Sequence, residues 1–157
     1  MRPEPIAFQR LRTQQHPHCV ACSPDHPNGL RLAFAVAADG SVEARFARGL
    51  AFEGYPGCLH GGAIAGLLDS AMTNCLFAHG CRAMTGELTV RFRHPAAVDR
   101  VAIVRAWIQQ TRPPLHLMRA ELRQDGRVVA AASAKFMELP PSDRTRARPE
   151  QTPSLEP

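Results

Sequence analysis

The sequence lacks any apolar run long enough to cross a membrane, and residues 1–8 lack the apolar core of a secretory signal. We therefore expect a cytoplasmic protein with no membrane partner, and a reducing compartment argues against a disulfide framework among its five cysteines. Aromatic residues make up only 6% of the chain and no nucleic-acid motif is present, so we expect no nucleic-acid partner despite the net charge of +5. The 157 residues, 45% of them apolar, suit one domain with a core.

One turn-rich segment stands out from the rest of the chain. Tyr55-Pro-Gly-Cys-Leu-His-Gly-Gly leads into apolar residues at helical spacing, which predicts a helix over residues 60–79. Asp69 is the only charged side chain of this helix. A carboxylate on so apolar a helix must be paired, hydrogen-bonded or functional, because burying a lone charge is costly. Neighbours such as Ser70 or Thr73 offer a purely structural explanation, which the sequence leaves open.

The start of the same helix carries a second chemical feature. The first N–H groups of a helix have no acceptor within it, and the helix dipole favours negative charge there. An amide at Gly61 or Gly62 is therefore placed to bind a carbonyl oxygen that becomes an oxyanion. A simple tight turn with a capping or core His60 is the alternative interpretation.

The spacing of these two features has a consequence for assembly. Gly61 and Asp69 lie eight residues apart, or roughly 12 Å along a helix axis, so one carbonyl cannot contact both. Two copies of the helix lying antiparallel across a twofold axis would bring Gly61 of one chain near Asp69 of the other. We expect a homodimer or a dimer of dimers with composite sites.

Strand patterns surround the predicted helix. Two segment pairs flank Asp-Gly turns and predict hairpins, and two further segments alternate like strands; the six ranges are 30–37, 42–46, 85–92, 101–109, 115–123 and 128–137. In residues 85–93, alternation places Leu88 on one face and Thr85 with Glu87 on the other. One helix segregated from a run of strands indicates an α+β domain with an antiparallel sheet.

Taken together, these features resemble a known family. The element order, the run Phe52-Glu-Gly-Tyr-Pro-Gly-Cys-Leu-His-Gly-Gly, the run Leu67-Leu-Asp-Ser-Ala-Met and the run Thr85-Gly-Glu-Leu-Thr-Val-Arg-Phe resemble hotdog-fold acyl-CoA thioesterases. The likeness is to the branch with the phenylacetyl-CoA and 4-hydroxybenzoyl-CoA thioesterases. It implies an antiparallel β-sheet wrapped around one long central helix, over residues 19–138. Residues 1–18 are then an extension with a possible short helix, and residues 139–157 read as a disordered Pro-rich tail.

The resemblance also implies roles for individual residues. Asp69 would be the nucleophile or general base acting on the thioester of an acyl-CoA substrate. The Gly61 amide would bind the thioester oxygen, His60 would stand at the helix start, and the Thr85 hydroxyl would position water or the acid. Many members carry Asn or Gln six residues before the histidine, where this chain has Gly54. The resemblance implies no cofactor.

Further candidates concern substrate binding. Gly62 shares the helix start with Gly61, and Thr73, one turn after Asp69, is a second hydroxyl that would position water. Of the 19 basic residues 18 are arginine, and Arg91 and Arg93 lie on a strand that would present them to coenzyme A phosphates.

Two alternatives to a thioesterase remain. One is a non-catalytic acyl-CoA-binding hotdog protein, which the glycine at position 54 favours. The other is a zinc-linked interaction or nucleic-acid module, because Cys19 and Cys22 lie in a stretch with His16, His18 and His26. A single Cys-x-x-Cys is also compatible with reduced, packed thiols, so we assign no metal and keep Cys19 and Cys22 only as metal-ligand candidates.

Overall fold

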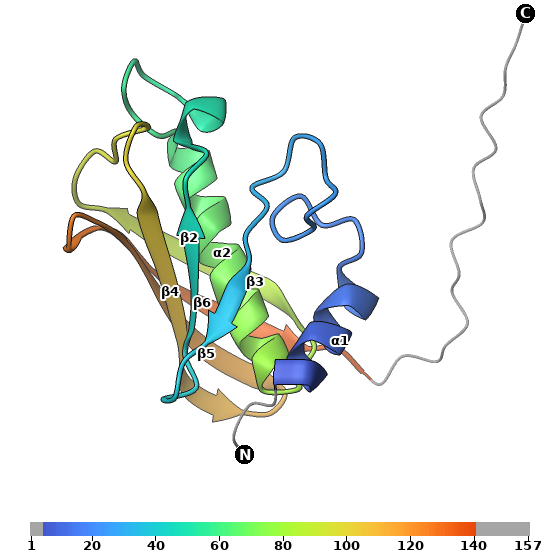
Figure 1. Cartoon of the computed structure of the whole chain (residues 1–157). Helices are drawn as coiled ribbons and strands as arrows, with labels where there is room; N and C mark the ends of the chain where they lie inside the picture. Colours follow the sequence, from blue (N-terminus) through green and yellow to red (C-terminus); the bar gives the residue numbers. More distant parts are fainter. Residues whose placement is uncertain (1–4, 141–157) are drawn as a thin grey trace, which may run out of the picture.

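The structure, a computed structural model, describes residues 5–140 (Figure 1). The secondary structure consists of two α-helices, a 3-10 helix and six strands: α1 Pro5–Gln15, β1 Phe34–Val36, β2 Val42–Phe46, η1 Gly49–Phe52, α2 Gly61–Ala78, β3 Ala83–Phe92, β4 Ala102–Arg112, β5 Leu115–Gln124 and β6 Arg127–Glu138. The expected short helix of the N-terminal extension corresponds to α1. The predicted disordered tail falls, beyond residue 140, outside the described residues.

The six strands form one antiparallel sheet in the order β1-β2-β4-β5-β6-β3. Figure 1 shows the sheet curving around α2, with α1 beside the C-terminal half of that helix. Leu67, Leu68 and Met72 of α2 are completely buried, as are Met118 and Phe136 of the facing strands. Burial of this apolar surface is the main contribution to the stability of the fold. The prediction of an α+β domain with a sheet wrapped around a central helix is confirmed.

The turn residues explain why the strands pair as hairpins. Asp125 and Gly126 have φ values of 50° and 75° and form the two-residue loop between the paired Gln124 and Arg127. Positive φ at both central residues matches the twist of a β-hairpin, and Asp-Gly adopts it readily. Gly40, with φ 82°, serves the turn between β1 and β2.

The first strand is shorter than predicted. β1 covers only Phe34–Val36, whereas the apolar alternation begins at Leu30. The backbone N–H groups of Leu30 and Leu32 donate to the carbonyl oxygens of Val20 and Ala21 instead of to a neighbouring strand. This segment therefore fixes the loop that precedes it rather than extending the sheet.

Strand β3 departs from regular alternation. Its register against β6 shifts between Thr85 and Glu87, so that Thr85 pairs with the buried Phe136 while Glu87 pairs with Lys135. The prediction that Thr85 shares the face of Glu87 is wrong, because Gly86 is the extra residue of a β-bulge. Thr85 faces α2 as a result.

Strand β3 also forms one edge of the sheet. Within residues 5–140 it pairs only with β6, and it is ten residues long. Two large apolar side chains at its ends are exposed, Met84 at 62% and Phe92 at 53%. A long edge strand with apolar side chains is a surface suited to pairing with another chain. Among the described residues, no helix has the length and apolarity needed to cross a membrane.

Candidate active site

The first turn of α2 is capped by the histidine that precedes it. His60 has φ −62° and ψ 135°, and its Nδ1 accepts a hydrogen bond of 2.9 Å from the N–H of Gly62. The ring is a neutral acceptor in this bond, which places its proton on Nε2. The Gly62 amide is thus occupied by the cap, whereas the Gly61 N–H, the first of the helix, has no acceptor within it. Of these two glycine amides, the Gly61 N–H is therefore the one that the cap leaves available to a ligand oxygen.

The ring of Phe92 lies over the same helix start. A Cβ atom at Gly61 would lie 3.5 Å from Cζ of Phe92, the last residue of β3. The alternation of β3 predicts Phe92 on the helix-facing side of the sheet, but this contact with Gly61 depends on how the sheet curves over the helix.

Asp69 and Thr85 form a hydrogen-bonded pair between α2 and β3. The Thr85 hydroxyl donates to Oδ1 of Asp69 at 2.7 Å. Asp69 is only partly buried and Thr85 is exposed, so the acid is not desolvated within one chain as its helix alone suggests. A charge-assisted bond to one carboxylate oxygen fixes its orientation and leaves the other oxygen free to accept a proton from water.

Thr73 takes a different part from the one suggested by its spacing. Its hydroxyl donates to the backbone carbonyl of Asp69 at 3.1 Å, and its side chain is buried. This is the i−4 bond that threonine commonly makes inside helices. The structure therefore does not bring the Thr73 hydroxyl to the carboxylate.

The glycine at position 54 lies directly against the capping histidine. A Cβ atom there would come within 3.2 Å of both Cα and Cδ2 of His60. A larger residue would force the ring to move, so the His60 ring occupies space that a side chain at position 54 would otherwise enter.

Arg91 and Arg93 lie away from Asp69. Arg91 pairs with Ala131 on the sheet face opposite α2, and both arginines line a groove of about 590 Å³ on that face with Trp107 and Arg119. Within one chain neither arginine lies beside Asp69, and their contact with coenzyme A phosphates stays a prediction. Strand alternation places both arginines on the face opposite Leu88, which the sequence shows, but only the packing of α2 makes that face the outer one.

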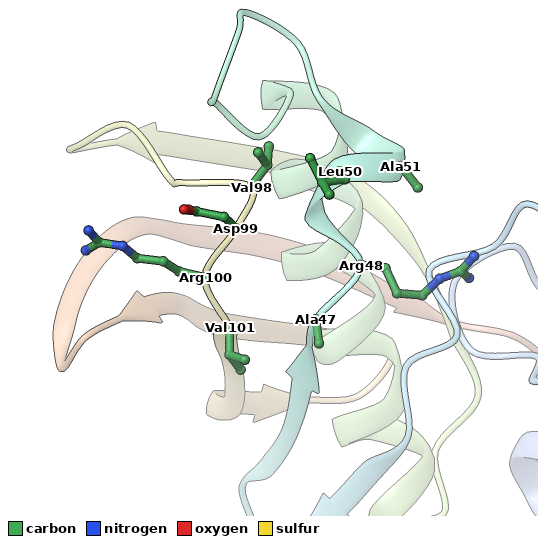
Figure 2. Close-up of a pocket in the computed structure, with 8 residues that line it drawn as sticks. All are labelled: Ala47, Arg48, Leu50, Ala51, Val98, Asp99, Arg100 and Val101. Atoms are coloured by element: carbon green, nitrogen blue, oxygen red, sulfur yellow. The ribbon is translucent and has the colours of Figure 1, made fainter.

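A cavity of about 480 Å³ lies between η1 and the segment before β4 (Figure 2). Leu50 and Val98 both line it, while Arg48 and Arg100 extend in opposite directions. Arg48 is engaged, since its guanidinium donates to the carbonyl oxygen of Gly29. The cavity contains neither Asp69 nor Gly61, and its diverging side chains do not converge on a reacting group.

Two clusters of side chains have the composition of a metal site. His16, Cys19 and Cys22 form one, and Cys81, His116 and Glu138 form the other; within each cluster the ligand atoms lie within 4.8 Å of one another. In the second, Nε2 of His116 is 3.0 Å from Oε1 of Glu138. Burial, followed by the bond to Glu138, raises the pKa of Cys81 to about 12, so this thiol is protonated at neutral pH.

In the first cluster, the pKa of one thiol is lowered instead of raised. The bond from Cys22 lowers the pKa of Cys19 to about 3, with further hydrogen bonds from His16 and from two backbone amides. The pKa of Cys22 is raised, because its proton is held in the bond to Cys19 and because burial disfavours a second charge. One thiolate is therefore already favoured here.

The sequence and the fold are similar to those of thioesterases. The sequence model of the family described as "Thioesterase superfamily" matches residues 56–131. The acyl-coenzyme A thioesterase THEM4 of Mus musculus is 35% identical over 65 residues, which cover 41% of this chain and 28% of that protein. This chain thus spans less than a third of that relative.

Solved structures match over more of the chain. A putative thioesterase, a phenylacetic acid degradation-related protein from Ralstonia eutropha JMP134, is 28% identical with a TM-score of 0.67, covering 83% of this chain and 98% of that one. A hypothetical thioesterase from Streptococcus pneumoniae TIGR4, solved with coenzyme A, is 18% identical with a TM-score of 0.64, covering 68% of this chain and 87% of that one. Two mutants of the latter protein replace an aspartate and a threonine, sixteen residues apart, by alanine.

The match of residues 56–131 and the shared architecture lead to one conclusion. The part of the chain that the structure describes has the hotdog fold of these solved thioesterases, and its residues 56–131 match the thioesterase superfamily.

Proposed function

We propose that the protein is an acyl-CoA thioesterase that hydrolyses an acyl-CoA thioester to the free acid and coenzyme A. The observation that carries the proposal is the 2.7 Å bond from Thr85 to Asp69, which orients a carboxylate at the exposed edge of the sheet. The same sixteen-residue separation of an aspartate and a threonine, both chosen for mutation in the Streptococcus pneumoniae thioesterase, supports this assignment.

The chemistry of the proposal needs an acid and an oxyanion donor. Asp69 accepts a proton from a water molecule, whose oxygen attacks the thioester carbonyl carbon. The carbonyl oxygen becomes an oxyanion. It accepts a hydrogen bond from the Gly61 N–H, which lies at the positive end of the helix dipole. The C–S bond then breaks, and the coenzyme A thiolate takes the proton back from Asp69. Direct attack by the Asp69 carboxylate, followed by hydrolysis of the anhydride, uses the same groups.

Within one chain, Gly61 and Asp69 are too far apart to contact the same carbonyl. In the proposal, a second chain supplies the missing group. Phe92, at the end of β3, lies over Gly61, while Thr85, near its start, bonds Asp69. If two β3 edges pair antiparallel across a twofold axis, the Phe92 end of one strand lies beside the Thr85 end of the other. Gly61 of one chain then faces Asp69 of the second, and pairing removes both exposed edges.

The remaining candidates take supporting parts or none. His60 holds the first turn in place by accepting a hydrogen bond from the Gly62 N–H. The Thr73 hydroxyl bonds to the backbone carbonyl of Asp69 within the helix. Arg91 and Arg93 lie on the outer face, so the proposal gives them no contact with substrate in the site of their own chain.

The decisive experiment measures release of free thiol from a panel of aliphatic and aromatic acyl-CoA substrates. The wild-type chain should hydrolyse at least one of them, and Asp69→Asn should lower kcat by on the order of 100-fold or more, because the amide cannot accept a proton. Asp99→Asn is the matched control, since Asp99 is an exposed acid of the cavity in Figure 2.

The same experiment separates the second candidate function. A non-catalytic acyl-CoA-binding protein would bind the substrates in calorimetry without hydrolysing them. Wild-type kcat in the Asp69→Asn variant would reject Asp69 as the catalytic acid.

A further inference from the structure

The loop after α1 holds an organised group of soft ligands that the proposed hydrolysis does not use. His16 directly follows α1, and Cys19 and Cys22 follow at intervals of three residues. Nδ1 of His16 lies 3.7 Å from Sγ of Cys22, and all three ligand atoms lie within 4.8 Å of one another. With metal–ligand bonds of about 2.0–2.3 Å, ligand atoms in a tetrahedral zinc site are separated by similar distances.

The backbone of the loop is folded around Cys19. The N–H of Ala21 donates to Sγ of Cys19 at 3.4 Å, and the N–H of Cys22 points to the same sulfur. The carbonyl oxygen of Cys19 in turn accepts a hydrogen bond of 3.0 Å from the N–H of Ser23. Amide donors aimed at a sulfur favour the thiolate, which is the form that binds a metal.

The central helix supplies surroundings that single out this cluster. The ring of Phe77 contacts His16 edge-on, with ring centroids 4.9 Å apart, which fixes the imidazole. Asn74, completely buried, lies against Cys22 through its amide group. Its Nδ2 donates to the carbonyl of Ser70, but its Oδ1 has no hydrogen-bond partner among the described residues. A buried acceptor without a partner is costly, so this part of the described core lacks a hydrogen-bond donor.

We infer that His16, Cys19 and Cys22 bind one zinc ion, with water as the fourth ligand, and that this ion fixes the loop after α1 where it packs against helix α2. Two thiolates and an imidazole in this arrangement suit zinc better than the hard cations, which prefer oxygen ligands. The Arg12 side chain of α1 also holds this loop, because it donates a hydrogen bond to the carbonyl oxygen of Cys22. This inference does not depend on the proposed hydrolase activity.

The first test is metal analysis of the full-length chain, purified under reducing conditions and loaded with zinc. Wild-type protein should hold about one zinc ion per chain, and a Cys19→Ser/Cys22→Ser variant should hold none. His16→Ala should weaken zinc binding by about 100-fold or more, since even loss of an outer-sphere partner costs 10–100-fold. His18→Ala is the matched control and should keep the ion, because His18 is exposed and outside the cluster.

A second variant distinguishes the two clusters. Cys81→Ser removes a thiol from the cluster with His116 and Glu138 and should leave the zinc content unchanged. Zinc lost with Cys81→Ser but kept in the double serine variant would overturn the assignment. Metal-free wild-type protein, or protein in which Cys19 and Cys22 are joined in a disulfide under reducing conditions, would also overturn it.

The wild-type chain offers a readout that is independent of any variant's folding. Cobalt added to chelator-treated protein should give the intense visible absorption of a tetrahedral site and a thiolate-to-cobalt charge-transfer band. Zinc should raise Tm of the chelator-treated protein, since binding to the folded state alone stabilises it. The absence of both the thiolate band and the Tm shift would contradict the inference.

Discussion

At the scale of single residues, the central feature is the pair of Asp69 and Thr85. Thr85 is exposed, so its hydroxyl does little for the core, and its bond to the carboxylate instead selects one orientation of Asp69. A bond from a hydroxyl to a charged group is worth about 1.5–3 kcal/mol. In the proposed mechanism, part of that energy holds the Asp69 carboxylate in the geometry needed for proton transfer.

We therefore expect Thr85→Val to lower kcat by about tenfold and to leave KM nearly unchanged, because the isosteric side chain removes the donor alone. Thr85→Ser keeps the hydroxyl and should retain most of the activity. Steady-state kinetics on the preferred acyl-CoA measures both variants. Equal losses in the two would show that the methyl group, rather than the hydroxyl, is what matters.

At the scale of the element, two adjacent glycine amides at the start of α2 differ in their hydrogen bonding. His60 occupies the Gly62 amide, and its ψ of 135° already suits a following proline, which prefers an extended residue before it. Proline is also well accepted at the first position of a helix. The Gly61 N–H can therefore be deleted without disturbing the helix.

Gly61→Pro should lower kcat by on the order of 100-fold or more, the usual effect of losing one oxyanion donor, while Tm stays close to wild type. Gly61→Ala is the control, because it keeps the N–H and its Cβ would meet Phe92 at an ordinary 3.5 Å. Kinetics and thermal unfolding of both variants check this. An active Gly61→Pro enzyme would exclude this amide as the donor.

At the scale of the whole molecule, the exposed β3 edge and the separation of Gly61 from Asp69 both predict a dimer. The separation is roughly 12 Å along the helix axis, which a single carbonyl does not bridge. Light scattering after gel filtration should show a dimer or a dimer of dimers. A fully active monomer would contradict composite sites.

Mixed dimers test the composite site directly. Co-expressed Gly61→Pro and Asp69→Asn chains should recover about a quarter of wild-type activity, since half of randomly paired dimers are mixed and each has one intact site. A Gly61→Pro/Asp69→Asn chain mixed with either single variant has no intact site and should recover none. Absence of recovery in the first mixture would place each site within one chain.

The sequence by itself determined those features of this protein that depend on neighbours along the chain. Apolar spacing predicted α2 to within a residue at each end, and the Asp-Gly turns predicted both hairpins, because helix periodicity and positive φ are local properties. The pairing of Asp69 with Thr85 was implied by family resemblance and is present as a hydrogen bond.

Only the tertiary structure decided which faces meet. The bulge at Gly86 turned Thr85 toward the helix against the alternation, although a glycine inside a strand is a known sign of such a bulge. Packing of α2 against one face of the sheet made the face of Arg91 the outer one, and the docking of the loop against α2 brought His16 to the two cysteines while leaving His18 outside. Register, strand order and loop docking are set by contacts between distant segments, so no local pattern specifies them.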